Sequence, residues 1–334
     1  MILAGDIGGT KTRLALYRAG AAAGASAAAP VAVPRTERTF PSRDHDSLEA
    51  IVTLFRRAHP EPIDAASFGV AGPVRDGRSE TTNLPWVIET PALATLLGLQ
   101  AARVGLLNDL EASAWGLAAL GPEDVLTLAP GSPGARGNSA MIAAGTGLGE
   151  AGLFWDGRRH RPFATEGGHA EFAPRTTLQD ALAQWLRARH GRVSWERVVS
   201  GPGLVNIHAF LRDTRRTPAS AWLEEAMRAG DPAAAISEAA LSGRDPLASE
   251  ALDLFVALYG AEAGDLALKM MATGGVYIGG GIAPRIKDRL AAGGFIAAFE
   301  AKGRMRALME SMPVHVVLND RAALLGAARH AARD

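Results

Sequence analysis

The chain has 334 residues, more than one compact core usually contains, so we expect two domains. Its 35 Lys and Arg residues balance its 35 Asp and Glu residues, which gives no support to a nucleic-acid partner or a charged membrane surface. The absence of cysteine excludes disulfides and thiolate metal sites and is consistent with a reducing cytosol. No apolar stretch is long enough to span a bilayer, and Asp6 interrupts the apolar N-terminus, which has no basic region like that of a signal peptide. We therefore expect a soluble, cytoplasmic protein.

The first stretch of the chain predicts a β-hairpin with a glycine turn. A short apolar run reaches Asp6, the segment Gly8-Gly9-Thr10 breaks the pattern, and a second apolar run follows. Glycine permits positive φ and close approach of a ligand, and the N–H groups of such a turn can bind an anion. Asp6 would repel a bare phosphate, which favours a cation between them, as in a Mg-nucleotide. Locally, an ordinary glycine-rich hairpin is an equal alternative.

The rest of the first half alternates between strands and helices. Residues 19–34 form an Ala-rich tract that we interpret as a hairpin excursion without function. We then expect a helix capped by Asp46, a strand over 66–71, a helix capped by Thr90 and stopped by Gly98, a strand over 103–107, and a helix over 110–120. The first of these helices should bury Leu48, Ile51, Val52 and Phe55 on one face.

The second half begins with a repeat of the opening pattern. After a Pro- and Gly-rich loop over 129–137, residues 140–144 read as a strand, Gly145–Gly149 as a turn and 151–154 as a returning strand. This weak internal repeat predicts two related lobes, each offering one glycine-rich loop to a cleft.

Further helices and two strands follow. We expect a helix capped by Thr177 with Leu178, Ala181, Leu182, Trp185 and Leu186 on one face, a helix around 204–211, helical structure over 219–249, and a long helix through 252–266. Strands are expected over 275–279 and 313–318, and Asp320 is expected to cap a terminal helix. Strands that alternate with helices predict the α/β class.

Three glycine clusters follow predicted strands. The segment Gly8 to Thr12 narrowly misses a P-loop, because Thr10 stands where that motif needs glycine. The segment Gly145-x-Gly147-x-Gly149 misses the dinucleotide fingerprint, whose third glycine belongs at Glu150. With Gly279-Gly280-Gly281 as the third cluster, the pattern indicates a phosphate- or nucleotide-binding cleft of another kind. The alternative is three unrelated tight turns.

Three segments offer polar side chains to a substrate. Asp109 directly follows a buried strand, so its carboxylate could accept a proton from a substrate hydroxyl, or it could simply be an N-cap. In Glu166-Gly-Gly-His169, two glycines allow both polar side chains to face one ligand, with a surface turn as the alternative. Glu196 follows Ser194 in a first helical turn, where an acid also favours the helix dipole.

Taken together, these segments resemble the bacterial glucokinases of the hexokinase/actin-like ATPase superfamily. The resemblance covers nearly the whole chain. It rests on Gly5 to Thr10 with Arg13, Asn108-Asp109, Gly145 to Gly149, Glu166 to Glu171, Glu196 to Gly203, and Gly275 to Gly281, all in family order.

The resemblance implies a two-lobed actin-like ATPase (ribonuclease H-like) fold with an interdomain cleft. It implies a small α/β domain of residues 1–118 plus 318–334 and a large one of residues 119–317. By the same resemblance, three segments hold ATP. The first phosphate loop consists of Gly5, Asp6, Gly8, Gly9 and Thr10, and the second of Gly145, Thr146 and Gly147. Gly280 and Gly281 lie on the adenosine side. Asp6 would hold Mg²⁺ through water. Glucose would be bound by Asn108, Asp109, Glu166, His169 and Glu196, with Asp109 as the general base.

The implied activity is phosphorylation of D-glucose to D-glucose 6-phosphate by ATP, the first step of glycolysis, and the family suggests a homodimer. A related group of sugar kinases and repressors carries a cysteine-rich zinc site, which a chain without cysteine cannot form. We also expect no DNA-binding domain before Asp6. The alternatives are a kinase for another hexose or amino sugar, and a non-catalytic sugar or nucleotide sensor.

Overall fold

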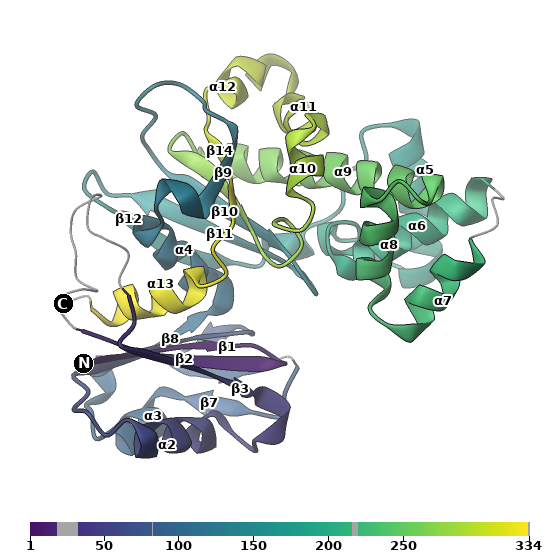
Figure 1. The fold of residues 1–334 in the computed structure, drawn as a ribbon. Helices are drawn as coiled ribbons and strands as arrows, with labels where there is room; N and C mark the ends of the chain where they lie inside the picture. The colour runs from purple at the N-terminus through teal and green to yellow at the C-terminus, as the bar shows by residue number, and fades with distance from the viewer. Residues whose placement is uncertain (19–32, 82, 216–219, 333–334) are drawn as a thin grey trace. The chain divides into compact units, whose positions relative to one another are not determined.

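The computed structural model describes residues 1–18, 33–81, 83–215 and 220–332, so most of the Ala-rich tract over 19–34 lies outside the described residues. Within them the strands form three sheets among helices, which confirms the predicted α/β class (Figure 1). Contacts within the chain define one unit of residues 1–124, 161–164 and 319–334, and a second of residues 125–160 and 165–318. No helix in the described ranges combines the length and apolar character needed to cross a bilayer.

The first unit is built on a five-stranded sheet of order β3-β2-β1-β4-β8. Its strands are β1 (Ile2–Ile7), β2 (Lys11–Tyr17), β3 (Thr36–Pro41), β4 (Ala65–Val70) and β8 (Val104–Asn108). Strands β1 and β2 are antiparallel, which confirms the predicted hairpin, whereas β1, β4 and β8 run parallel. A three-stranded sheet consists of β5 (Val74–Arg75), β6 (Arg78–Glu80) and β7 (Val87–Glu89).

Both faces of the five-stranded sheet are covered, which explains why β1 is apolar almost throughout. Leu3 and Ile7 pack in one cluster with residues of α2 (Leu48–Ala58) and α3 (Thr90–Leu97). Figure 1 shows these two helices on one side of the sheet. Ile2 and Ala4 point to the opposite face and pack against α13 (Ala322–Ala331). Side chains alternate between the faces of a strand, so a strand buried on both sides needs apolar residues at successive positions.

Several helices begin one residue away from the predicted cap. The cap of α2 is Ser47 and not Asp46, because the Ser47 side chain accepts a hydrogen bond from the N–H of Ala50. Thr90 is the first residue of α3, after the cap residue Glu89, while Gly98 ends the helix in the left-handed conformation as predicted. The four predicted core residues of α2 are buried.

Two further predicted caps are wrong in the same way. Helix α5 (Thr177–His190) is capped by Thr176, whose side chain accepts a hydrogen bond from the N–H of Gln179. On this helix Leu182 and Leu186 are buried as predicted, but Leu178 and Ala181 are exposed. Asp320 does not cap α13, which follows Arg321; the Asp320 carboxylate instead pairs with Arg13 at 2.7 Å.

The second unit is built on a six-stranded sheet of order β12-β11-β10-β13-β14-β9, although residues 161–164 of the edge strand β12 are grouped with the first unit. Its strands are β9 (Val125–Ala129), β10 (Ser139–Ala144), β11 (Leu148–Trp155), β12 (His160–Thr165), β13 (Gly275–Gly279) and β14 (Val314–Val317). Strands β10 and β11 form an antiparallel hairpin, and β10, β13 and β14 run parallel. The order β3-β2-β1-β4-β8 in the first unit has the same hairpin followed by parallel strands, so the internal repeat predicted from sequence is confirmed in the topology.

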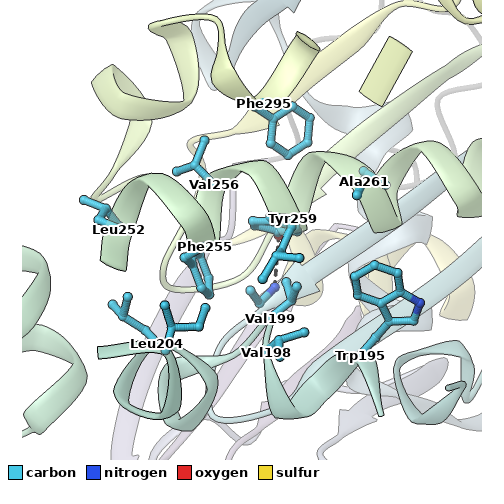
Figure 2. Close-up of a cluster of buried hydrophobic side chains, with 14 of the residues drawn as sticks. Trp195, Val198, Val199, Leu204, Leu252, Phe255, Val256, Tyr259, Ala261 and Phe295 are labelled. Carbon is cyan, nitrogen blue, oxygen red and sulfur yellow. Dashed lines mark hydrogen bonds between the residues drawn. The ribbon is translucent and has the colours of Figure 1, made fainter. Parts of the chain in front are cut away.

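The core of the second unit surrounds the long helix α9. Its helices, including short ones, are α5, α6 (Gly201–Arg215), α7 (Ala221–Ala229), α8 (Pro232–Leu241), α9 (Pro246–Met270), α10 (Lys287–Ala291), α11 (Gly294–Glu300) and α12 (Arg306–Glu310). Figure 2 shows Phe255 and Tyr259 of α9 among the buried side chains of this core. The hydroxyl of Tyr259 accepts a hydrogen bond of 3.1 Å from the N–H of Ala144, which anchors the end of β10 to α9.

Candidate active site

The first glycine turn joins β1 to β2 and is braced by a serine from outside the hairpin. The N–H of Gly8 donates to the carbonyl of Lys11 at 2.9 Å, and the hydroxyl of Ser42 donates to the carbonyl of Gly8 at 2.7 Å. Neither Gly8 nor Gly9 uses the positive φ that glycine permits. At Gly9 the backbone packs closely on another residue of the chain, because an added Cβ would lie 2.6 Å from Cβ of Asn83.

Asp6 lies near the end of β1, opposite Arg13 on β2. Burial raises the pKa of the Asp6 carboxyl to about 6; Arg13 opposes this shift, while the negative charges of Asp109 and Asp320 add to it. Gly5 precedes it in the buried part of the strand, where an added Cβ would lie 2.5 Å from the ring of Phe68. Packing in the sheet therefore accounts for glycine at position 5.

Asn108 and Asp109 stand where β8 passes into α4 (Asp109–Gly116). The Asn108 side chain caps α4 by accepting from the N–H groups of Leu110 at 3.0 Å and Glu111 at 3.4 Å, and its Nδ2 donates to the carbonyl of Gly72 at 3.2 Å. The alternative interpretation of Asp109 as the cap is therefore wrong. Asp109 is the first helical residue and is exposed. Its Oδ1 accepts from the N–H of Leu110 at 2.8 Å.

Gly69 lets α4 lie close to the sheet. A Cβ at Gly69 would be 2.6 Å from Cβ of Ala112 and 3.8 Å from Cα of Asp109. Because β1, β4 and β8 are parallel, their carboxyl ends meet at one edge of the sheet, which is where Asp6 and Asp109 lie.

The second glycine turn, Gly145 to Gly147, joins β10 to β11. Gly145 N–H donates to the carbonyl of Gly147 at 2.9 Å, and the N–H of Gly201, at the start of α6, donates to the carbonyl of Gly145 at 2.8 Å. Glu196 supports the other side of the turn, since its Oε2 accepts from the N–H of Leu148 at 3.0 Å. An added Cβ at Gly147 would lie 2.5 Å from that same oxygen.

The third glycine cluster packs against the end of β10. Gly280 has a φ of 82°, and an added Cβ there would lie 2.4 Å from the carbonyl oxygen of Ala144. The N–H of Ile282 donates to that carbonyl at 3.3 Å. The second and third clusters are thus neighbours, and for these two the interpretation as unrelated turns is wrong.

A cavity of about 1220 Å³ opens beside these two clusters within the second unit. Gly145, Thr146 and Gly281 line it, together with residues of α6 and α8. Gly147 and Gly280 instead allow the close packing described above. The cavity exceeds the usual range of small-molecule sites, and it is bordered by the backbone of two glycine segments.

The Glu166–His169 segment is an exposed turn pressed against the beginning of β11. The Glu166 and His169 side chains approach to 4.0 Å and are 69% and 57% exposed. An added Cβ at Gly168 would lie 2.0 Å from the carbonyl oxygen of Leu148, so only glycine fits there without displacement. Leu148 therefore contacts this turn through its carbonyl and Glu196 through its N–H, which brings Glu166, His169 and Glu196 around one strand.

The predicted site residues fall into two groups by unit. Gly5, Asp6, Gly8, Gly9, Thr10, Asn108 and Asp109 belong to the first unit, and Gly145, Thr146, Gly147, Glu166, His169, Glu196, Gly280 and Gly281 belong to the second. Sequence reasoning missed Ser42, which braces the first turn, since no local motif marks a serine whose partner is 34 positions away.

No group of three or more His, Cys, Asp or Glu side chains in the described ranges is arranged to hold a metal ion. A single half-buried carboxylate such as that of Asp6 still suits Mg²⁺, because this ion keeps several waters and binds through one or two carboxylates plus substrate phosphates.

Comparisons with known proteins agree on one family. The family model described as glucokinase matches residues 3–334. A glucokinase of Nostoc sp. is 41% identical over 348 aligned residues, covering 100% of this chain and 99% of the relative. The crystal structure of a glucokinase from an Antarctic psychrotroph matches with a TM-score of 0.84 and 31% identity, covering 98% of each chain.

A more distant structure shows the same fold. A ROK family glucokinase from Streptomyces griseus, crystallised with glucose and AMPPNP, matches with a TM-score of 0.64 and 23% identity over 98% of this chain and 97% of its own. The chain thus has the actin-like ATPase fold of these sugar kinases. The full-length match of the family model and the identity to full-length relatives show that the chain belongs to the glucokinase family.

Proposed function

We propose that the chain transfers the γ-phosphoryl group of ATP to the 6-hydroxyl of D-glucose, forming glucose 6-phosphate and ADP. The observation that most directly supports this proposal is a hydrogen bond: Glu196, proposed here to bind the sugar, accepts from the N–H of Leu148, which follows the turn proposed to bind phosphate. Phosphoryl transfer needs chiefly positioning and neutralisation of charge, and a backbone turn beside several sugar-binding oxygens can provide both.

In the proposed reaction, Asp109 accepts the proton of the glucose 6-hydroxyl as its oxygen attacks the γ-phosphorus. The bond from the γ-phosphorus to the bridging oxygen breaks, and ADP leaves. The exposed carboxylate of Asp109, at the carboxyl edge of a parallel sheet, suits this role. The glycine turns at Gly8 and Gly145 would hold phosphates through backbone N–H groups, and Gly281 would border the adenosine. Asp6 would hold Mg²⁺, which neutralises phosphate charge when bound.

The glucose hydroxyls would be bound by Asn108, Asp109, Glu166, His169 and Glu196. The amide nitrogen of Asn108 carries two N–H groups, and the bond to Gly72 uses one of them. Five polar side chains binding one small polyol would provide specificity, because a sugar that lacks a hydroxyl would leave one of them unpaired. We further propose that the enzyme acts in the cytoplasm as a homodimer.

Glucose-dependent release of ADP from ATP tests this proposal. We expect ADP release with glucose and Mg²⁺ and none without sugar. Parallel reactions with mannose, fructose and N-acetylglucosamine test the substrate. Turnover with one of these and not with glucose would make the chain a kinase for another sugar, and binding of glucose and ATP without ADP formation would make it a sensor. Sedimentation of the purified protein tests the dimer.

A further inference from the structure

Two buried carboxyl groups have no part in the proposed chemistry, and one of them, that of Glu150, lies against the Glu166–His169 turn. Glu150 on β11 is 2% exposed and Glu262 on α9 is fully buried. Among the described residues, no N–H or hydroxyl group hydrogen-bonds to Oε1 of Glu150 or to either carboxyl oxygen of Glu262. Two ionised carboxylates so placed would repel each other without solvent, whereas one proton between them removes a charge and supplies an O–H donor.

The charged groups around the pair do not neutralise it. Lys269 Nζ lies 3.8 Å from Glu262 Oε1, but its side chain is 54% exposed, so water screens it. Lys302 is already paired with Asp265, whose negative charge adds to that of the two glutamates. Buried acids thus exceed the cations that can balance them.

We assign this proton to Glu262. Burial raises the pKa of both carboxyls, and the charge of Glu150 raises that of Glu262 further. A side-chain hydrogen bond between them lowers the pKa of Glu150 and raises that of Glu262, so Glu262 is the donor and Glu150 the acceptor. The hydroxyl of Tyr259, the neighbouring phenol, accepts from Ala144.

Glu150 forms the surface on which the Glu166–His169 turn rests. An added Cβ at Gly167 would lie 1.9 Å from Oε2 of Glu150, so the glycine Cα packs directly on this carboxyl. The backbone carbonyl of Glu150 also accepts from the hydroxyl of Thr165 at 2.9 Å, and Thr165 Oγ1 accepts from the N–H of Gly167 at 3.3 Å. A movement of the Glu150 side chain therefore displaces Gly167 and its neighbours Glu166 and His169.

We propose that Glu150 and Glu262 are positioning residues for sugar binding: the proton that Glu262 donates to Glu150 holds the Glu150 carboxyl beneath Gly167 and thereby sets Glu166 and His169. This inference rests on the proposed function, in which Glu166 and His169 bind glucose. Loss of the proton makes the two carboxylates repel, so the turn shifts and glucose binds more weakly, while ATP binding changes less.

Three variants test the pair. Glu262→Gln keeps a neutral donor that cannot ionise, Glu262→Leu removes the donor at similar volume, and Glu250→Gln is a matched control on the exposed side of α9, where Glu250 pairs with Arg215. For each, the KM for glucose, the KM for ATP and kcat are measured from about pH 7 to about pH 10, with thermal melting to establish folding.

We expect the parent and Glu250→Gln to lose affinity for glucose at the alkaline end. The KM of Glu262→Gln for glucose should match that of the parent within about twofold near neutral pH and should not rise at alkaline pH. Glu262→Leu should raise glucose KM about tenfold with smaller changes in kcat and ATP KM, because Glu150 loses its donor.

A folded Glu262→Leu variant with the glucose KM of the parent would overturn the inference. If that variant does not fold, Glu262→Gln provides the test. An alkaline rise in its glucose KM equal to that of the parent would also overturn the inference. A parent enzyme that releases no ADP with glucose is a different result, because it removes the proposed function itself.

Discussion

Oε2 of Glu196 accepts a 3.0 Å hydrogen bond from the backbone N–H of Leu148, the residue that follows the second glycine turn. One carboxylate therefore supports a proposed phosphate-binding turn while its other oxygen remains for a sugar hydroxyl. An added Cβ at Gly147 would lie 2.5 Å from the same oxygen, so the turn packs closely on this carboxylate.

Replacing this carboxylate tests the coupling. We expect Glu196→Ala to raise the KM for both glucose and ATP by about tenfold or more, since a hydrogen bond to a charged group contributes about 1.5–3 kcal/mol. Steady-state kinetics with each substrate varied in turn measures this. Glu224→Gln, at an exposed glutamate on α7, is the control. A change in glucose KM alone would show that the turn does not depend on Glu196.

The proposed base makes a different prediction. Asp109→Asn should lower kcat by a factor of about 10² to 10⁴ and leave glucose KM nearly unchanged, because the amide keeps its place in α4 but cannot take the proton. The ADP-release assay measures kcat. Asp180→Asn replaces an exposed acid in the first turn of α5 and should behave as the parent. Near-normal turnover of Asp109→Asn would remove Asp109 from the base role.

Two glycines near the end of β10 should differ in what their substitution changes: ATP binding for Gly145 and stability for Gly280. Gly145 has no atom within 4 Å of an added Cβ and lines the cavity, so Gly145→Ala should fold normally and raise ATP KM by obstructing the phosphates. Gly280→Ala combines a φ of 82° with a 2.4 Å contact to Ala144 and should lower the melting temperature. Thermal melting and ATP kinetics on both variants compare them. Equal melting temperatures for the two variants would contradict this account.

Stability should depend on pH through Glu262. Burial, then the charge of Glu150, raises the pKa of Glu262 from 4.5 to about 9, so the unfolded chain releases this proton at lower pH than the folded one. The stabilising contribution of the protonated form is complete below about pH 4.5 and is lost as the pH rises towards about 9, at up to about 1.4 kcal/mol per pH unit.

Glu262→Gln should flatten this dependence. In urea unfolding from about pH 6 to about pH 9, the free energy of unfolding of the variant should increase relative to that of the parent as the pH rises, because the amide stays neutral in the folded and unfolded states. The free energy of unfolding of Glu250→Gln should depend on pH as that of the parent does, since Glu250 is partly exposed and pairs with Arg215 at the surface. Identical slopes for the parent and Glu262→Gln would mean that Glu262 is ionised in the folded protein.

Asp6 carries the prediction for the metal. Chelation with EDTA should abolish turnover and added Mg²⁺ should restore it, and Asp6→Asn should require more Mg²⁺ because the amide provides a weaker oxygen ligand. Titration of activity against Mg²⁺ measures this. An unchanged requirement in Asp6→Asn would place the ion elsewhere.

Local sequence determined where most elements lie and which family the chain belongs to. The glycine turns at Gly8 and Gly145, the stop at Gly98 and the strand over 275–279 follow from patterns within a few residues, where turn chemistry and side-chain period act. The family motifs are similarly short, and the prediction of a glucokinase from them is confirmed by the family model.

The tertiary structure was needed to decide which of two adjacent residues caps a helix and which distant side chains pair. Asn108 rather than Asp109 caps α4, because only the backbone path decides which oxygen reaches the free N–H groups. Asp320 pairs with Arg13, 307 positions away, instead of capping α13. The buried carboxyls of Glu150 and Glu262 lie on a strand and a helix from distant parts of the chain. Such contacts form only when the chain packs. The hydrophobic period of a segment predicts which of its faces is buried, but it does not predict which side chains from other segments pack against that face.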